Sequence, residues 1–485
     1  MALGTAVAPA APRDQPAVGW PQLQHDAEHT GYTPEALHAT HGMRTAWVTD
    51  FRALGPQQHI APNVQVVVAE QRLFVPTMEG QLFALDPRTG EILWHAECGG
   101  AVLHTAGVEQ GRVFVATIGG DVLCLNAASG KELWRWNSGK RAGFSAAVLL
   151  AEDKVFVGSR QGDVHAIAQA DGKPVWSYAV GAPIFQTPAW NAGRVYVAAE
   201  DMHCYALSAT HGKLLWKSRK LGGVSFRDYH PLVHDGVVLV EAMQAGGGYS
   251  SPSKPMAPSW NVTAEETKWA RQHLPVLASG QVPESTLREI IGPQDRQVEE
   301  LKRDPGRMTR FALDATTGEE RILPNWYKGG MLGPRQPGMV DRDGRVLVDA
   351  SCLVFGCGYG RLDLKRERVV DLLLDRDYDY FQPGSHAPGV GNPDETMLFS
   401  AAGPLIFAVH PGHPFGIFSG PCAHYVGYYD LDRRRWTPFT EEMHQWMDTN
   451  RRSPNAQCGG SAPSIAYGAV YRQALDYVFC HVPKE

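Results

Sequence analysis

The sequence predicts an all-β propeller of eight four-stranded antiparallel blades, and three observations support it. A motif made of an apolar strand, a glycine turn and a tryptophan recurs four times between residues 74 and 216. Its tryptophans, Trp94, Trp134, Trp176 and Trp216, are 40, 42 and 40 residues apart, which is the period of one propeller blade. Finally, an unpaired outer strand near the N-terminus could complete the surplus strands near the C-terminus.

The second copy of the motif shows why each residue type recurs. Residues 112–116 are apolar, β-branched and aromatic, as expected of a strand buried on both faces. Gly120 can adopt the positive φ of a tight hairpin, and the chain returns antiparallel through 122–125. The outer strand, 132–136, carries Trp134. We expect this tryptophan to pack against the next blade and not to stack on a ligand, because packing between repeats demands repetition at a fixed period.

The pattern continues in weaker form outside this block. Residues 311–319 form another third strand and turn, displaced by an insertion. Outer strands are expected near residues 47, 94, 134, 176, 216, 323, 370 and 436. This gives eight blades, with seven as the alternative if one weak copy is misread. Pairing of the strand around Trp47 with the last C-terminal strands would close the ring and remove its open edges.

Two stretches carry a resemblance to a known family. One is 84–94, ALDPRTGEILW, with its copies, and the other is 20–32, WPQLQHDAEHTGY, which resembles the opening segment of bacterial members. On these motifs the chain is similar to the pyrroloquinoline-quinone-like (PQQ-like, or quinoprotein-like) propeller superfamily. The similarity is strong over 20–216 and patchy beyond it. It is specific for fold and not for function, since the superfamily includes quinone-dependent alcohol dehydrogenases and the outer-membrane assembly scaffold.

The chain is expected to form a single propeller domain over residues 20–485. Residues 1–19 are rich in alanine and proline and are predicted to be a disordered lead-in. A partly helical insertion, 246–307, interrupts the ring. Its helical patterns lie at 263–273, 285–291 and 294–303. An insertion of this length on a propeller covers one mouth of the central channel or mediates oligomerisation, and we favour a lid.

Charge and composition limit the classes of binding partner and the cellular locations that we expect for this protein. The net charge of −6 gives no broad electrostatic reason to bind nucleic acid or an anionic membrane. No stretch approaches the roughly 20 apolar residues of a membrane span, and residues 1–19 lack the features of a secretory signal. The resemblance implies an exported, mature protein, periplasmic or secreted, while a cytoplasmic location stays open. Cys124 and Cys204 are expected to be buried thiols, whereas disulfide pairing stays open for Cys352, Cys357, Cys422 and Cys458.

Alignment of the repeats predicts which side chains face the axis. In three blades a proline lies five residues before a glycine at the innermost strand; these are Pro188, Pro231 and Pro463. The residues just before these prolines, and their equivalents in other blades, should line a funnel at the centre of the ring. The side chains expected to converge there are His59, His104, Gln186, Tyr229, His230 and His386, with Arg141, Arg227 and Asp228 adjacent.

These residue types suggest acid/base or metal chemistry in the funnel. Imidazoles exchange protons near neutral pH or bind a metal through neutral nitrogens, and guanidinium groups neutralise anions. The predicted catalytic residues are Tyr229, His230, His104 and His386, and the predicted substrate-binding residues are Arg227, Arg141, Gln186 and Asp228. A divalent metal would be held by His59, His104 and His386. The alternative is that the histidines only hydrogen-bond ordered water in a polar channel.

Three functional hypotheses follow. The first is an enzyme that eliminates or hydrolyses a polar, in some cases anionic, saccharide-like small molecule or oligosaccharide. The second is a PQQ-dependent alcohol or sugar dehydrogenase, but the chain has no adjacent Cys-Cys pair and no Cys-x-x-Cys-His haem site. The third is a non-catalytic scaffold that binds a protein partner. A scaffold has no use for histidine, tyrosine and arginine gathered at the channel mouth, so we favour the first.

Overall fold

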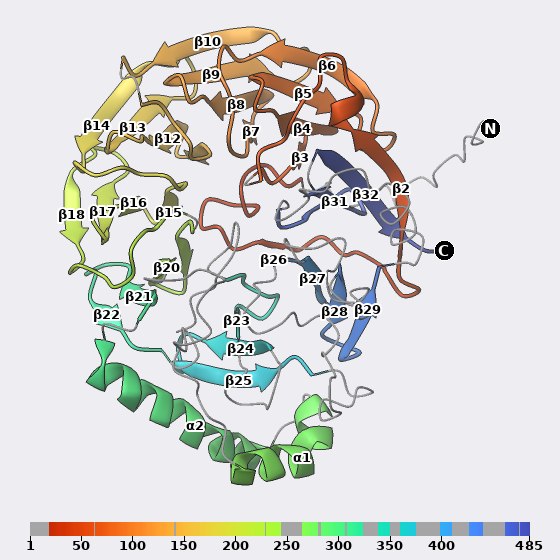
Figure 1. Ribbon diagram of the computed structural model, residues 1–485, viewed down its shortest axis with the longest axis vertical. Helices are drawn as coiled ribbons and strands as arrows, with labels where there is room; N and C mark the ends of the chain where they lie inside the picture. Colours follow the sequence, from red (N-terminus) through yellow and green to blue (C-terminus); the bar gives the residue numbers. More distant parts are fainter. Residues whose placement is uncertain are drawn as a thin grey trace.

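The computed structural model describes residues 19–62, 64–139, 142–227, 229–243, 264–279, 283–305, 308–323, 338–349, 359–374, 398–409, 426–439, 461–474 and 476–485. Their strands form eight sheets arranged around a common centre, so the fold is an eight-bladed propeller (Figure 1). The predicted fold class is confirmed, and the alternative of seven blades is wrong. We number the blades in chain order from the first complete one.

Blades 1 to 4 are the four clear repeats, and each has four antiparallel strands. Blade 1 contains β3 (Val67–Ala69), β4 (Arg72–Pro76), β5 (Gln81–Leu85) and β6 (Ile92–Glu97), and blade 2 contains β7 (Gly107–Glu109), β8 (Arg112–Ala116), β9 (Asp121–Asn126) and β10 (Glu132–Asn137). Blade 3 contains β11 (Leu149–Ala151), β12 (Lys154–Gly158), β13 (Asp163–Ala168) and β14 (Pro174–Ala179), and blade 4 contains β15 (Ala189–Asn191), β16 (Arg194–Ala199), β17 (His203–Ser208) and β18 (Leu214–Lys217).

Blades 5 to 8 are the weaker repeats. Blade 5 contains β19 (Leu232–His234), β20 (Val237–Glu241), β21 (Arg310–Asp314) and β22 (Glu320–Arg321), and blade 6 contains β23 (Val346–Asp349), β24 (Tyr359–Asp363) and β25 (Arg368–Leu372). Blade 7 contains β26 (Leu398–Ala402), β27 (Leu405–Val409), β28 (Val426–Asp430) and β29 (Arg435–Pro438), with β1 (Tyr32–Thr33) parallel to β26. Blade 8 contains β30 (Ser464–Ala466), β31 (Ala469–Ala474), β32 (Tyr477–Pro483) and β2 (Met43–Asp50), which a short 3-10 turn, Phe51–Ala53, follows. The pairing of β2 with β32 confirms the predicted ring closure.

The repeated tryptophans join neighbouring blades. Trp94 of blade 1 lies against Gly130 of blade 2, and its Nε1 donates a hydrogen bond to the carbonyl of Ala127 at 3.2 Å. Gly130 has a φ of +71°, and a Cβ there would lie 2.6 Å from the indole, so only glycine fits. We call this the indole–glycine contact. It recurs in the pairs Trp47–Gly90, Trp134–Gly172, Trp176–Gly212 and Trp216–Gly318, which confirms the predicted packing role.

The N-terminal segment runs around the inside of the ring. We call residues 20–31 the inner belt, and Figure 1 shows this red segment at the centre of the molecule. Trp20 pairs with Val68 of blade 1, and belt atoms accept hydrogen bonds from a backbone N–H of each of the next six blades. These donors are Val108, Leu150, Trp190, Val233, Val340 and Ala401. The belt therefore satisfies inner-strand backbone groups that would otherwise face the channel unpaired.

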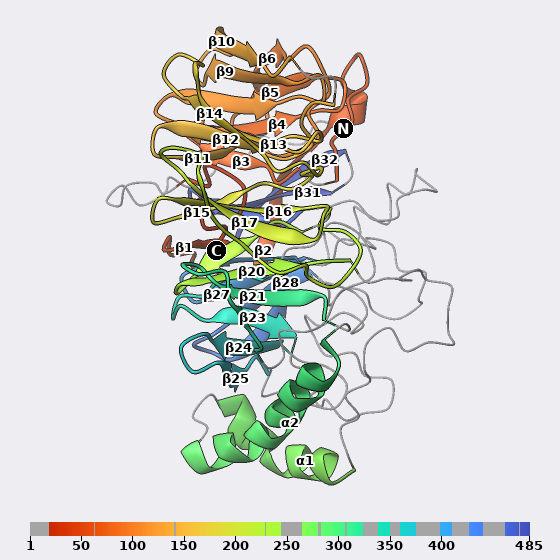
Figure 2. The same cartoon turned by 90° about the vertical axis from the view of Figure 1, so that its left-hand side faces the viewer.

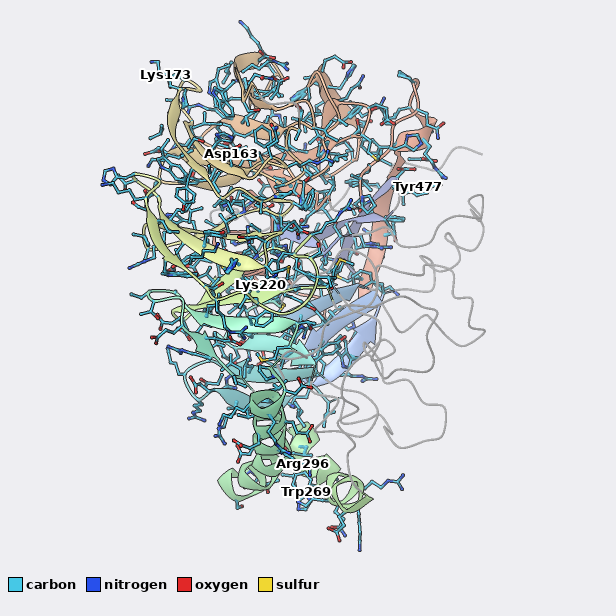
Figure 3. All side chains as sticks on the ribbon, turned by 60° about the vertical axis from the view of Figure 1, so that its left-hand side comes forward. Asp163, Lys173, Lys220, Trp269, Arg296 and Tyr477 are labelled. Carbon is cyan, nitrogen blue, oxygen red and sulfur yellow. The ribbon has the colours of Figure 1, made fainter. Side chains whose placement is uncertain are left out.

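The described helices of the insertion lie outside the ring. Helix α1 (Ala264–Ser279) contacts β25, the outer strand of blade 6, and α2 (Glu284–Arg303) extends beside it (Figures 1 and 2). Figure 3 shows Trp269 and Arg296 on these helices at the far end of the molecule, away from the blades of the first repeats. Leu301 of α2 lies in the apolar cluster formed by blades 4 and 5. Because residues 246–263 of the insertion lie outside the described residues, the predicted lid stays a prediction. The predicted helices 285–291 and 294–303 form one continuous helix.

Several predictions are tested only in part by the described residues. Residues 1–18 of the predicted lead-in and four of the eight cysteines, Cys352, Cys357, Cys422 and Cys458, lie outside them. Cys124 and Cys204 are buried and free, as expected, and burial raises the pKa of each thiol to about 12. In the described part of the chain, no helix is both long and apolar enough to cross a membrane.

Candidate functional site

Three imidazoles meet at the centre of the ring. His29 comes from the inner belt, His104 precedes β7 of blade 2, and His230 precedes β19 of blade 5. The rings of His29 and His230 are 4.9 Å apart between centroids and nearly perpendicular, and His104 interacts electrostatically with both. All three side chains are at least 95% buried. We call these residues the axial histidine cluster.

The backbone of the belt fixes the orientation of His29. Its neighbours on either side are held by hydrogen bonds, Val233 N–H to the Glu28 carbonyl at 2.9 Å and Val340 N–H to the Thr30 carbonyl at 2.8 Å. His29 Nδ1 lies 2.8 Å from the carbonyl of Pro231, so Nδ1 carries the proton and donates. Nε2 therefore bears a lone pair, and this buried atom has no hydrogen-bond partner within the described structure.

Asp26 shapes the turn of the belt that presents His29. Its Oδ1 accepts hydrogen bonds from the backbone N–H groups of Glu28 and Thr30, both at 3.0 Å, and its Oδ2 accepts one from the Thr30 hydroxyl. Burial alone would raise the pKa of Asp26, but interactions with His25 and Thr30 outweigh it and lower the pKa. The carboxylate therefore stays ionised and holds the belt in the conformation that points His29 at the axis.

His104 uses both ring nitrogens within the protein. The backbone N–H of Thr105 donates to His104 Nδ1 at 2.9 Å, so the ring proton lies on Nε2, which hydrogen-bonds Gln186. Gln186 Nε2 in turn donates to the carbonyl of Arg227 at 2.6 Å. This chain of hydrogen bonds links blades 2, 4 and 5, so His104 and Gln186 orient the site. The Nε2 atoms of His29 and His230, in contrast, have no hydrogen-bond partner in the described structure.

The cluster is electrically neutral at pH 7. Burial lowers the pKa of His29 to about 4, although the Pro231 carbonyl and the Asp26 carboxylate both oppose this shift. Burial also lowers the pKa of His104 to about 4. Burial lowers the pKa of His230 well below its usual range, and the two neighbouring imidazoles add to the effect. Neutral imidazoles accept hydrogen bonds or bind metals, and they are poor proton donors.

The structure brings together three of the predicted site residues. His104 and His230 belong to the axial histidine cluster, and Gln186 hydrogen-bonds His104. Tyr229 is buried next to His230 in the chain. Because His386, Arg141 and Asp228 lie outside the described residues, their predicted roles stay predictions. His29 was missed, because the belt is not a repeat and the alignment of blades could not place it. The signal available was that 20–32 carries two histidines and an aspartate without forming a blade strand.

The side chains of two predicted residues make other contacts. The Arg227 side chain is exposed, with its guanidinium 5.5 Å from the centroid of the Phe185 ring, and only its carbonyl joins the site. His59 is 45% exposed, and its Nδ1 lies 2.6 Å from Glu79 Oε1; this hydrogen bond raises the pKa of His59. None of the interactions described for His59 joins it to the axial histidine cluster, so its expected place in the funnel stays a prediction. Within the described residues, no group of three or more His, Cys, Asp or Glu side chains is arranged to hold a metal.

A bound PQQ does not fit the described part of this site. PQQ carries three carboxylates, which need cationic or hydrogen-bond-donating partners when buried. None of the interactions described for the three imidazoles involves a lysine or an arginine. The indole rings of the five indole–glycine contacts are also occupied by packing, so these tryptophans cannot stack on a quinone.

Comparison with known proteins agrees with the observed fold. A family model described as outer membrane protein assembly factor BamB matches residues 36–135 and 118–248. The quinohemoprotein alcohol dehydrogenase of Comamonas testosteroni has 13% sequence identity and a TM-score of 0.53, with 96% of this chain and 81% of that chain covered. The quinohemoprotein alcohol dehydrogenase ADHIIG of Pseudomonas putida HK5 gives the same identity and TM-score, with 96% and 80% covered.

The comparisons support the fold and leave the activity open. BamB of Moraxella catarrhalis is 14% identical over 91% of this chain and 98% of that chain, with a TM-score of 0.39. Comparison with curated protein sequences gives no match. Solved structures at 13% identity show a shared fold alone. The family-model match over residues 36–248, the repeats and the eight blades agree with the resemblance to PQQ-like, or quinoprotein-like, β-propeller repeat proteins.

Proposed function

We propose that the protein binds a neutral, hydroxyl-rich small molecule of the saccharide type at the axial histidine cluster. One observation carries the proposal: the Nε2 atoms of His29 and His230 are buried, and neither has a hydrogen-bond partner in the described structure. A buried polar atom without a partner costs about 1–3 kcal/mol. A ligand hydroxyl can donate to His29 Nε2, and a second hydroxyl can donate to or accept from His230 Nε2, so the site is suited to hydroxyl groups.

The uncharged state of the cluster determines the class of ligand. Neutral imidazoles carry no positive charge to compensate a carboxylate for the loss of its hydration, whereas an uncharged hydroxyl group needs only a hydrogen-bond partner. Arg227, which we expected to neutralise an anionic substrate, directs its guanidinium away from the cluster. The hydroxyls of Ser145 and Ser461 are also buried without a partner, near the inner strands of blades 3 and 8. A neutral polyol is therefore a better candidate than the anionic saccharide.

The predicted elimination or hydrolysis finds less support than binding. Such reactions need an acid and a base whose pKa values lie near the working pH. A pKa of about 4 leaves His29 and His104 unprotonated and weakly basic at pH 7. In this proposal the histidines hold hydroxyl groups in place, and any chemistry on the bound molecule requires groups beyond these imidazoles.

The test is calorimetric titration of the full chain with neutral and uronate-containing oligosaccharides and, separately, with divalent metal ions. We expect a neutral oligosaccharide to bind, and His29→Phe and His230→Phe each to weaken its affinity at least about tenfold, since each removes one buried hydrogen bond. His59→Gln is the matched control and should bind like the wild type. Failure of all saccharides to bind, or wild-type affinity in both Phe variants, contradicts the proposal. Stoichiometric metal binding that both variants abolish would instead assign a metal site.

A second candidate function is that of a protein-binding scaffold. In blades 1 to 4 the aliphatic residue before each outer-strand tryptophan is 47–49% exposed; these residues are Leu93, Leu133, Val175 and Leu215. The family model described as an outer membrane assembly factor matches the same blades. A variant with serine at all four positions should lose co-purification of a partner from the native host, while His29→Phe should retain it. If neither variant changes co-purification, this candidate fails.

A further inference from the structure

Among the described residues, the indole–glycine contact is absent from the three interfaces between blades 5 and 8, and at two of them, 5–6 and 6–7, charged residues stand in its place. In blades 1 to 4 the tryptophan pairs with the third-strand residue two positions before the turn; for example, Trp94 pairs with Ala84, before Asp86. In blade 5 the same register places Arg321 opposite Ala312, before Asp314. In blade 6 it places Asp371 opposite Arg361, before Asp363. Arg321 and Asp371 thus occupy the tryptophan position.

The glycine position has changed at the same two interfaces. In blades 1 to 5 this turn residue is a glycine with a positive φ, as in Gly130 with +71°, and its N–H donates a hydrogen bond to the carbonyl four residues earlier. In blade 7 the equivalent residue is Arg434, with a φ of +54° and a hydrogen bond from its N–H to the Asp430 carbonyl at 2.7 Å. In blade 6 it is Glu367, also with a φ of +54°. At each of these two interfaces, a charged residue therefore occupies the tryptophan position and a residue of opposite charge occupies the glycine position.

The substituted residues face each other as ion pairs. Arg321 Nη1 lies 3.7 Å from Glu367 Oε1 across the interface of blades 5 and 6, and the side chains are 37% and 52% exposed. Across the interface of blades 6 and 7, Arg434 Nη1 and Nη2 donate to Asp371 Oδ2 and Oδ1 at 3.0 and 3.1 Å, and both residues are buried. We propose that blade 6 is held in the ring by charge on both sides, and that it undocks from the ring in a salt-dependent way before the other blades separate.

The two interfaces differ in strength for a physical reason. An exposed ion pair changes a local equilibrium by only about two- to fivefold, and salt screens it, because the Debye length falls from about 10 Å at 0.1 M to about 3 Å at 1 M. The buried bidentate pair is screened much less. Packing of an indole against glycine is apolar and gains nothing from low salt. The interface of blades 5 and 6 is therefore the one that salt should open first.

Other contacts indicate what moves with blade 6. Its innermost strand is reduced to a single bridge between Val340 and Val346, so fewer backbone bonds hold this sheet together. Helix α1 contacts β25, and Arg434 Nη2 donates to the Leu277 carbonyl of α1 at 3.4 Å. Helix α1 and blade 6 thus form one packed unit, with blade 7 joined to it through the Arg434 side chain.

The test is hydrogen exchange of the full chain at 0.05 M and 1 M sodium chloride, read by mass spectrometry. We expect exchange of β24, β25 and α1 to rise about two- to fivefold at high salt, while β9 and β13 stay unchanged. In the double variant Arg321→Trp with Glu367→Gly, which introduces an indole–glycine contact, the rise should disappear. In the reciprocal variant Trp134→Arg with Gly172→Glu, β9 and β13 should acquire it. Equal exchange of β24 and β25 at both salt concentrations in the wild type would overturn the proposal, whether or not the variants fold.

Discussion

Acidification should destabilise this protein through the axial histidine cluster. In the unfolded chain a histidine titrates near pH 6.5, whereas His29 and His104 in the folded protein titrate at about 4. Between these two values the unfolded state binds more protons, so folding stability is complete above pH 6.5 and falls as the pH drops toward 4. At 1.36 kcal/mol for each pKa unit, a shift of about 2.5 units removes about 3 kcal/mol for each histidine.

The assay is urea denaturation followed by tryptophan fluorescence at pH 7.5 and pH 4.5. At pH 4.5 most of the loss has occurred, so His29 and His104 together should lower the free energy of unfolding by about 5 kcal/mol. His230 acts in the same direction. His29→Gln and His104→Gln should each recover roughly 2 kcal/mol of the difference between the two pH values. His59→Gln should recover none, because the pKa of His59 is raised by Glu79. Equal pH dependence in the wild type and both cluster variants would refute the reasoning.

Three further predictions concern the packing of the ring. Trp134→Ala should lower the free energy of unfolding by about 3 kcal/mol, because the indole fills the interface with the next blade. Leu133→Ala, at an exposed site, should change it by less than about 0.5 kcal/mol. Urea denaturation compares the two variants, and equal effects would contradict the packing role of Trp134. Gly130→Ala should lower the melting temperature more than Gly139→Ala. Both glycines have a φ near +70°, but only Gly130 has an indole within 4 Å. Equal shifts in the melting temperature would contradict the role of the indole. Deletion of residues 1–31 should lower the free energy of unfolding by about 1 kcal/mol for each lost hydrogen bond of the inner belt, and should make calorimetric unfolding less cooperative. An equally sharp transition at an unchanged temperature would argue against the belt as a structural element.

The repeated part of the fold could be predicted because each clear blade carries the same sequence motif. The spacing of the tryptophans, the turn glycines and the apolar middle strands recur, so the positions of the outer strands followed from counting. Ring closure by the strand around Trp47 followed from the need to remove open edges. The convergence of His104 and His230 was also accessible, because equivalent positions in a propeller meet at its centre.

The rest depended on contacts that no repeat encodes. The inner belt binds backbone N–H groups of successive blades, and backbone groups leave no sequence signal, so neither its path nor His29 could be foreseen. The ring of His59 pairs with the carboxylate of Glu79 and is partly exposed, a contact that the alignment of repeats did not predict. The helical patterns of the insertion showed amphipathic segments without indicating which blade they cover. Leu301 lies in the apolar cluster of blades 4 and 5, which also contains Trp216 and Phe311.

The central claim is that His29, His104 and His230 meet at the axis as neutral imidazoles. Nitrogen-15 NMR of the histidine side chains, followed from pH 8 to pH 4, tests it most directly. We expect His29 and His104 to remain neutral through pH 6 and to titrate near pH 4, with His29 protonated only on Nδ1 before that. Titration of all three near pH 6.5, as in solvent-exposed histidines, would contradict the buried cluster on which the proposed binding site depends.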